Sequence, residues 1–354
     1  WMSGYYRGII TGAERLVWLS WLNSVVATGR FVLVLPFLMF VSSSPRIFFA
    51  FQLAVGCVEL IWLIVKAYSL LPIMPKGQRI HWEWAPVKPV LKFAMSIAVT
   101  SSIWVFVTQT DKLVLSKIIL LSDYGYFSVA VLLASGIMVV SSPISSALMP
   151  RMAKLEAEGQ HEELIILYRK ATQLVALIAV PTSLVLAFLS GQVLWAWTGN
   201  EELVSKASPV LTLYAVGYGF LALGAFPYYL QYSKGDLKLH LIGNISFVVV
   251  LIPSVIWATN QHGMTGAGWA WVVSNVTYFL TWVPLVHQKF APGLHKKWIM
   301  IDILRIAVPA ILTVALVSYF MPWSNQRIIL IGELLMFGVA LLFLGAFFRL
   351  KKVH

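Results

Sequence analysis

A few charged and polar side chains interrupt long apolar stretches of this 354-residue chain, and these are the residues with the most evident capacity for chemistry. Arg30 lies near the middle of the apolar stretch Leu19–Val41. A guanidinium in such a place needs water or a fixed anion, and it binds carboxylate or phosphate groups through paired hydrogen bonds. Two interpretations stay open: a structural pair with Glu59 in the next apolar stretch, or an anionic ligand in a watery cavity.

A second group of candidates closes the apolar stretch Pro89–Thr110. Asp111 and Lys112 are neighbours and cannot share one helical face, so one can point into a cavity while the other extends to the membrane interface. Lys117 follows as a further candidate cation.

A third group precedes or ends later apolar stretches. Arg169 and Lys170, followed by Gln173, stand where a basic pair either anchors a membrane helix or holds an incoming anion. Gln231 follows Tyr228 and Tyr229, whose rings suit either sugar stacking or interfacial anchoring. We therefore expect these eight polar residues to be the candidate ligand-binding set: Arg30, Asp111, Lys112, Lys117, Arg169, Lys170, Gln173 and Gln231.

The sequence offers no candidate catalytic or metal-binding constellation. The seven histidines have no metal-ligand spacing, and the single cysteine, Cys57, excludes a disulfide within the chain. A glycine-rich phosphate loop, a nucleophile elbow and a Ser/His/Asp pattern are all missing from the sequence. We predict neither a catalytic site, nor a metal site, nor a cofactor, and the chain is not expected to be an enzyme.

The elements that must position these residues are apolar stretches of membrane-spanning length. The chain is 59% hydrophobic and 11% charged, with a mean hydropathy of +0.82. Stretches of about 20 residues cross a hydrocarbon core of about 30 Å as helices, which satisfy their own backbone hydrogen bonds. The sequence predicts an all-α, polytopic membrane protein with about ten crossings: Leu19–Val41, Ile47–Leu70, Pro89–Thr110, Tyr124–Leu148, Ala171–Trp195, Pro209–Leu230, Leu239–Ala258, Thr265–Leu285, Trp298–Phe320 and Ile328–Phe348.

The basic residues fix the expected orientation. Of the 26 Lys and Arg residues, 20 fall in alternate gaps assigned to one face, five on the other face, and Arg30 lies within a crossing. The positive-inside rule then places both ends in the cytoplasm. The net charge of +12 reflects this bias and attraction to anionic headgroups, so it is no argument for nucleic acid.

Two inner gaps stand out. Residues 71–88 contain Pro72, Pro75 and Pro86 and form the best boundary between lobes. The segment Arg151–Lys170 is charged, rich in helix formers and interrupted at Gly159, which predicts a cytoplasmic helical hairpin. The chain opens on Trp1 with no whole crossing before Trp18, so we expect upstream sequence to be missing.

Five segments, in this order and at helix-scale spacing, resemble the central half of Wzx-type O-antigen and polysaccharide flippases of the multidrug/oligosaccharidyl-lipid/polysaccharide superfamily: Thr110–Lys117, Tyr124–Ala130, Ser142–Met152, Leu167–Gln173 and Trp197–Asn200. Upstream, Tyr6–Gly8, Gly12–Arg15, Asn23 and Arg30 are similar to the family's fourth and fifth helices. The resemblance covers essentially the whole chain.

The resemblance implies a fold of the MATE type, with two six-helix lobes, often followed by two extra helices. On that frame the chain lacks roughly the first three helices. Residues 1–70 would be the remnant of the N-terminal lobe, 71–88 a cytoplasmic linker, 89–288 the C-terminal lobe, and 289–354 the two extra helices with a basic tail.

The resemblance also implies the function: flipping an undecaprenyl-diphosphate-linked oligosaccharide across the bacterial inner membrane by alternating access. The implied partners are that lipid-linked oligosaccharide, membrane lipids, a polysaccharide polymerase, glycosyltransferases and a coupling ion, H⁺ or Na⁺. The eight candidate residues above would then line the path of the diphosphate headgroup.

Two other interpretations remain open. A peptidoglycan-precursor flippase or a cation-coupled drug exporter would be another transporter of the same superfamily; a drug exporter should offer cavity carboxylates, and we count only Glu59, Glu333 and Asp111 as acids in the crossings. A membrane enzyme such as a glycan polymerase should have a large outer loop, whereas the predicted outer gaps are under about 15 residues, far below a domain.

Overall fold

The computed structural model describes residues 2–40, 44–71, 84–85 and 87–350. Every regular element in these ranges is a helix, so the predicted all-α class is confirmed. The chain divides into two compact units, Trp1–Glu83 and Trp84–His354. The division falls within the predicted linker 71–88, most of which lies outside the described residues.

The first unit consists of two long apolar helical stretches and one short helix. Helix α1 (Met2–Gly12) precedes α2 (Leu16–Ala27), which continues without a break through the π-helical segment η1 (Thr28–Leu33) into α3 (Val34–Phe40); α4 (Pro45–Leu70) follows. Ile10, Leu22, Leu63 and Ala67 form the buried core where α1, α2 and α4 meet. This small core holds together α1, which carries Arg7, α4, which carries Glu59, and α2, which leads into η1 with Arg30.

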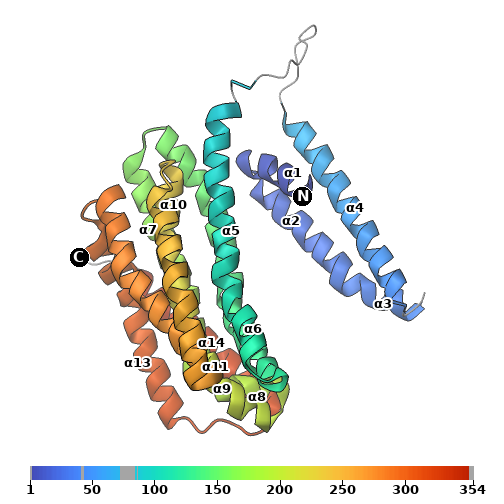
Figure 1. Ribbon diagram of the computed structural model, residues 1–354, viewed down its shortest axis with the longest axis vertical. Helices are drawn as coiled ribbons and strands as arrows, with labels where there is room; N and C mark the ends of the chain where they lie inside the picture. Colours follow the sequence, from blue (N-terminus) through green and yellow to red (C-terminus); the bar gives the residue numbers. More distant parts are fainter. Residues whose placement is uncertain (1, 41–43, 72–83, 86, 351–354) are drawn as a thin grey trace. The chain divides into compact units, whose positions relative to one another are not determined.

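The second unit packs its helices around α9, which contacts α6, α7, α8 and α11. Figure 1 labels most of its helices. They begin and end as follows: α5 (Val87–Ile118), α6 (Leu121–Ala157), α7 (His161–Phe188), α8 (Ser190–Thr198), α9 (Glu201–Gly224), α10 (Phe226–Ser233), α11 (Lys238–Phe290), α12 (Leu294–Lys297), η2 (Trp298–Leu304), α13 (Arg305–Phe320) and α14 (Arg327–Leu350). The centre of the core is aromatic. The Tyr214 ring stacks on Trp271, with 5.7 Å between the ring centroids, and contacts the Phe127 ring edge to face.

Helix α11 is a hairpin of two antiparallel helices. Its continuity is broken at Gly263, whose φ of 58° and ψ of −139° are non-helical, and which only glycine adopts readily. Residues before and after Gly263 therefore contact each other along the hairpin. The ring centroids of Phe247 and Tyr278 are 5.6 Å apart, and Asp236, just before the helix, accepts a 2.7 Å hydrogen bond from Lys289 near the end of the helix. The two halves correspond to the predicted crossings Leu239–Ala258 and Thr265–Leu285.

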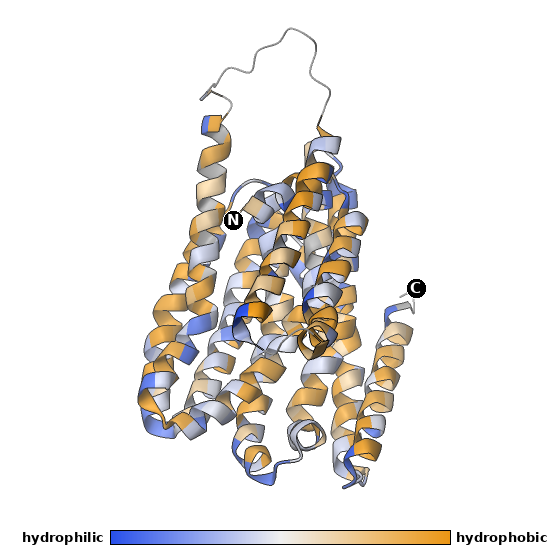
Figure 2. Cartoon of the chain, turned by 90° about the vertical axis from the view of Figure 1, so that its right-hand side faces the viewer, coloured by the Kyte–Doolittle hydropathy of each residue, from blue (hydrophilic) through white to orange (hydrophobic). Residues whose placement is uncertain are grey.

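Eight helical stretches of the described chain are long and apolar enough to cross a membrane. Because one of them is the α11 hairpin, they account for nine of the ten predicted crossings. The remaining prediction, Pro89–Thr110, lies in α5, which is 32 residues long but is outside those eight. In Figure 2, apolar residues follow the helices through most of their length and hydrophilic residues gather near the turns. The chain is a multi-pass membrane protein.

The charged segment Arg151–Lys170 is helical on both sides of a tight turn, as its sequence predicts. Helix α6 extends to Ala157, Gly159 takes a left-handed φ of 72°, and α7 begins at His161. Lys234 donates a 3.0 Å hydrogen bond to Glu156, so the turn between α10 and α11 lies beside this one. These two charged turns of the second unit are therefore at the same end of the helices.

Close packing between α9 and α11 leads to a stability prediction. A Cβ atom at Gly217 would lie 2.3 Å from Cδ1 of Trp271, whereas one at Gly136, inside α6, would meet nothing within 4 Å. Gly217→Ala should therefore lower the free energy of unfolding by about 1–3 kcal/mol through overpacking, and Gly136→Ala should leave it unchanged or raise it by up to about 1 kcal/mol.

Thermal unfolding of the two purified variants in detergent provides the measurement. Equal melting temperatures for both would contradict the close approach of α9 to the Trp271 indole.

Candidate functional site

The first unit holds a cluster of two arginines on one carboxylate. Glu59 of α4 accepts hydrogen bonds from Arg7 of α1 at 2.5 Å and from Arg30 of η1 at 2.9 Å. Arg7 also donates to the Asn23 side chain at 2.6 Å. The Glu59 side chain is 10% exposed, but those of Arg7 and Arg30 are 30% and 39% exposed. The structural pair that the sequence left open is thus present, and it has a second cation.

This cluster retains an excess positive charge. Two guanidinium groups face a single carboxylate, and arginine stays protonated at every physiological pH. The Nε atom of Arg30 is buried and has no hydrogen-bond partner among the described residues. An anion with several oxygens would satisfy that donor and neutralise the remaining charge.

The backbone around Arg30 is itself irregular. Arg30 lies within a π-helical segment, and its carbonyl accepts a 3.1 Å hydrogen bond from the Gln52 side chain of α4. Short π-helical insertions in α-helices occur frequently at functional sites. The irregular backbone, the unpaired donor and the excess charge coincide on one residue.

The second group of candidates is divided by the structure. Asp111 of α5 is almost fully buried and accepts a 2.8 Å hydrogen bond from the Tyr214 hydroxyl of α9. Lys112 is half-buried and donates to Gln109 on its own helix at 3.4 Å, and Lys117 is exposed. Asp111 and Lys112 are adjacent in sequence but lie in different environments, so they do not form one site.

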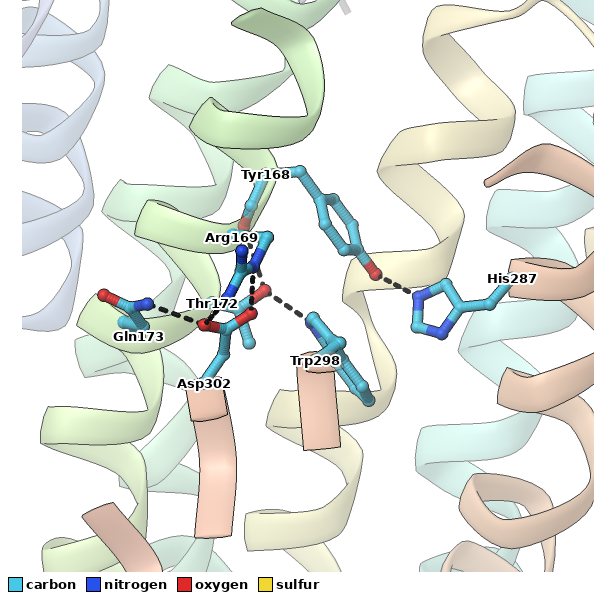
Figure 3. Close-up of polar contacts among 7 residues, drawn as sticks. All are labelled: Tyr168, Arg169, Thr172, Gln173, His287, Trp298 and Asp302. Carbon is cyan, nitrogen blue, oxygen red and sulfur yellow. Dashed lines mark hydrogen bonds and ion pairs between the residues drawn. The ribbon is translucent and has the colours of Figure 1, made fainter. Parts of the chain in front are cut away.

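Arg169 and Gln173 converge on a carboxylate that the sequence analysis did not count among the acids in the crossings. Asp302, in η2, is fully buried and accepts from Arg169 Nε at 2.8 Å, from Arg169 Nη2 at 3.0 Å and from Gln173 Nε2 at 2.6 Å (Figure 3). These donors are therefore occupied by a protein carboxylate instead of a phosphate. The count of three intramembrane acids was wrong, because Asp302 lies inside the predicted crossing Trp298–Phe320.

A buried chain of aromatic and imidazole groups adjoins this ion pair. The Tyr168 hydroxyl lies 2.7 Å from His287 Nε2, and His287 Nδ1 lies 2.9 Å from His295 Nδ1. Trp298 donates to the Thr172 hydroxyl at 2.9 Å (Figure 3). Together these bonds join α7, the end of α11 and η2, so the segment leading into α13 is fastened to the main body of the unit.

The remaining candidates lie apart from both clusters. Lys170 is exposed on α7, next to the buried pair but not part of it. Gln231 is almost fully buried, and its amide donates only to the Pro227 carbonyl within α10. Across the part of the chain that the structure describes, no group of three His, Cys, Asp or Glu side chains could hold a metal ion.

Two participants were missed at the sequence level, Arg7 and Asp302. The signal for Arg7 was Glu59 itself, since a carboxylate within an apolar helix requires cations. The signal for Asp302 was its place in an apolar helix, four residues after Trp298. Neither pairing can be read from spacing, because 52 and 133 residues separate the partners.

Comparison with known protein families indicates the class of protein. Residues 33–202 match a family model described as "Polysaccharide biosynthesis protein". The matched region runs from the end of η1 through the start of α9. Over these residues it agrees with the resemblance to polysaccharide flippases found in the sequence, and no curated protein matches the chain significantly.

A solved structure with a similar backbone identifies the fold. "Lipid II flippase MurJ, inward closed conformation" aligns with a TM-score of 0.63 and 14% sequence identity, covering 98% of this chain and 71% of that one. The chain therefore has a MurJ-like fold. The assignment of the eight candidate residues to a ligand path stays a prediction.

The Arg169–Asp302 pair can be tested by separating its structural role from a role in transport. Arg169→Met should destabilise the protein by about 3 kcal/mol or more, because it leaves a fully buried carboxylate with the Gln173 amide but without a cation. The double variant Arg169→Met/Asp302→Leu should recover near-native stability, since no charge remains. Thermal unfolding in detergent and surface-glycan display are the two measurements.

If the pair is only a tie between α7 and η2, the double variant also keeps export. A stable double variant without export would instead assign Arg169 to the path of the ligand. Lys170→Met is the matched control, because Lys170 is the exposed neighbour outside the pair.

Proposed function

We propose that this protein is a flippase that moves a lipid-linked oligosaccharide, an undecaprenyl-diphosphate-linked repeat unit of O-antigen or a related polysaccharide, across the bacterial inner membrane. The family match to polysaccharide biosynthesis proteins and the lipid-flippase fold support this class. The single observation that carries it is the cluster of Arg7 and Arg30 on Glu59.

The physical problem is the charged head of the substrate. A bare charge at the bilayer centre costs about 2.5–3.5 kcal/mol on insertion scales, and a diphosphate carries at least two. Arg7 and Arg30 offer partly exposed cations whose mutual repulsion is only half-neutralised by Glu59. A diphosphate that docks there gains charge-assisted hydrogen bonds and relieves the excess charge.

Transport of this kind breaks no covalent bond. The protein needs only to expose a polar cavity to one side of the membrane at a time while the lipid tail stays in the bilayer, as in alternating access. H⁺ or Na⁺ coupling, and cooperation with glycosyltransferases and a polysaccharide polymerase, belong to the same proposal. The protein acts as a transporter and not as an enzyme.

A peptidoglycan-precursor flippase is the second candidate, and the MurJ-like fold favours it. Both substrates share a diphosphate and a polyprenyl tail, so the arginine cluster serves either one. Loss of surface glycan with normal cell-wall growth in a deletion strain supports the polysaccharide substrate, whereas cell lysis supports the peptidoglycan precursor.

Arg30 is the residue that tests the proposal. In a strain whose surface glycan depends on this protein, Arg30→Ala should reduce surface glycan by at least about tenfold, and Arg30→Lys should be partly active, because lysine keeps the charge but loses the bidentate geometry. Arg46→Ala is the matched control, since Arg46 is exposed at the start of α4.

The Glu59 pairing requires a second variant. Arg30→Ala/Glu59→Gln removes both charges and should insert normally yet remain inactive. Full glycan display by Arg30→Ala, or recovery of display in the double variant, would reject diphosphate binding and leave a structural ion pair. Immunoblots of membranes report the amount of each variant.

The proposed orientation places the turn after α6 in the cytoplasm. In a Cys57→Ser background, Gln160→Cys should stay unlabelled by a membrane-impermeant maleimide in intact cells with a permeable outer membrane, and Gln261→Cys, beside the Gly263 turn, should be labelled. Labelling at position 160 without permeabilising the inner membrane would invert the topology.

A further inference from the structure

A cavity of about 280 Å³ lies within the second unit, beside the break between α9 and α10. The break is a one-residue interruption at Ala225, whose φ of −71° and ψ of −24° remain helical, and Pro227 follows in the first turn of α10. Proline lacks the N–H that would continue the helical ladder, so the chain can change direction there.

The cavity wall is rich in aromatic rings. Tyr228 and Tyr229 come from α10, Phe220 from α9, and Phe247, Tyr278 and Phe279 from the two halves of α11. Several meet edge to face, with Phe247 and Tyr278 at 90° and Phe220 and Phe279 at 71°. Such packing holds the rings in fixed orientations, and the Tyr228 ring also lies against the His240 imidazole, with the two ring centroids 4.4 Å apart.

Polar lining residues are few: both amides and the imidazole of His240 are on α11, and Ser101 of α5 and three tyrosines complete the set. The Asn244 amide nitrogen donates to His240 Nε2 at 3.1 Å, and the Asn275 amide nitrogen donates to the Trp271 carbonyl at 2.8 Å. No hydrogen bond to the Oδ1 atom of either asparagine is found among the described residues. Both carbonyl oxygens thus remain available to accept from hydroxyl groups.

Of the three parts of a lipid-linked oligosaccharide, the diphosphate, the isoprenoid tail and the sugars, the lining residues fit one best. No Lys, Arg, Asp or Glu is among the lining residues, which excludes the diphosphate as the preferred occupant. An isoprenoid tail would leave the two amides unsatisfied. A sugar ring presents apolar C–H faces to aromatic rings and hydroxyls to amides, and the volume is at the small end of ligand pockets, enough for about one or two rings.

We propose that this cavity binds a sugar ring of the transported oligosaccharide, with Tyr228 as the stacking platform and Asn244 and Asn275 as hydroxyl acceptors. The inference rests on the proposed function for the identity of the ligand. It assigns sugar recognition to the second unit and binding of the charged diphosphate to Arg7 and Arg30 of the first unit.

Three probes test the assignment on the full chain in lipid nanodiscs: the lipid-linked oligosaccharide extracted from producing cells, undecaprenyl diphosphate without sugar, and the same oligosaccharide released from its lipid. Calorimetric titration of the wild type should give about tenfold tighter binding of the sugar-bearing lipid than of the bare lipid.

Tyr228→Leu, which keeps volume but loses the aromatic face, and Asn244→Leu should each weaken binding of the sugar-bearing lipid by about tenfold and leave the bare lipid unchanged. Tyr232→Leu is the matched control, since Tyr232 is also a tyrosine of α10 but lies outside the cavity lining. Unchanged melting temperatures identify variants that fold.

Equal affinities of the wild type for the two lipids, together with no binding of the released oligosaccharide, would overturn the sugar site. Equal losses for both lipids in Tyr228→Leu would do so as well. A third outcome separates the two proposals. If the wild type binds the released oligosaccharide but neither lipid, and Tyr228→Leu abolishes that binding, the cavity is a sugar-binding site. The proposed flippase function is then wrong.

Discussion

The compensation of charge inside apolar helices is the constraint on which this structure depends. Each buried carboxylate described above has donors assembled around it from other helices: Arg7 and Arg30 on Glu59, Arg169 and Gln173 on Asp302, and Tyr214 on Asp111. In a low-dielectric surrounding an unpaired carboxylate is far more costly than in water. These few contacts therefore fix which helices pack together in a chain that is otherwise apolar throughout.

The two ion-pair clusters differ in stoichiometry, and that difference separates a structural role from a functional one. At Asp302 a single cation and an amide satisfy a fully buried carboxylate, and Lys170, the neighbour of that cation, is exposed. At Glu59 two partly exposed cations share one anion. The first arrangement is complete in itself, whereas the second has capacity for a further negative group.

The sequence predicted the elements better than the contacts between them. Apolar stretches located nearly all the crossings, because the length of a membrane helix is set by the bilayer, and Gly159 marked the turn between α6 and α7 correctly. The candidate residues were found by their unusual position in apolar surroundings, which says that a charge needs a partner but not which one. Arg169 was thus taken as a candidate for phosphate when its partner, Asp302, lies 133 residues away.

The tie between α7 and η2 has a mechanical consequence. Because removing Arg169 from the pair would leave the fully buried Asp302 carboxylate without its cation, which is costly, we expect α13 to move together with α7. Arg327 adds a second fastening, since its guanidinium donates to the Ala196 and Trp197 carbonyls at the end of α8. The terminal helices are therefore attached to α7 and α8, and bending is expected elsewhere in the backbone, for example at the π-helical segment around Arg30 or near Pro227 in the first turn of α10.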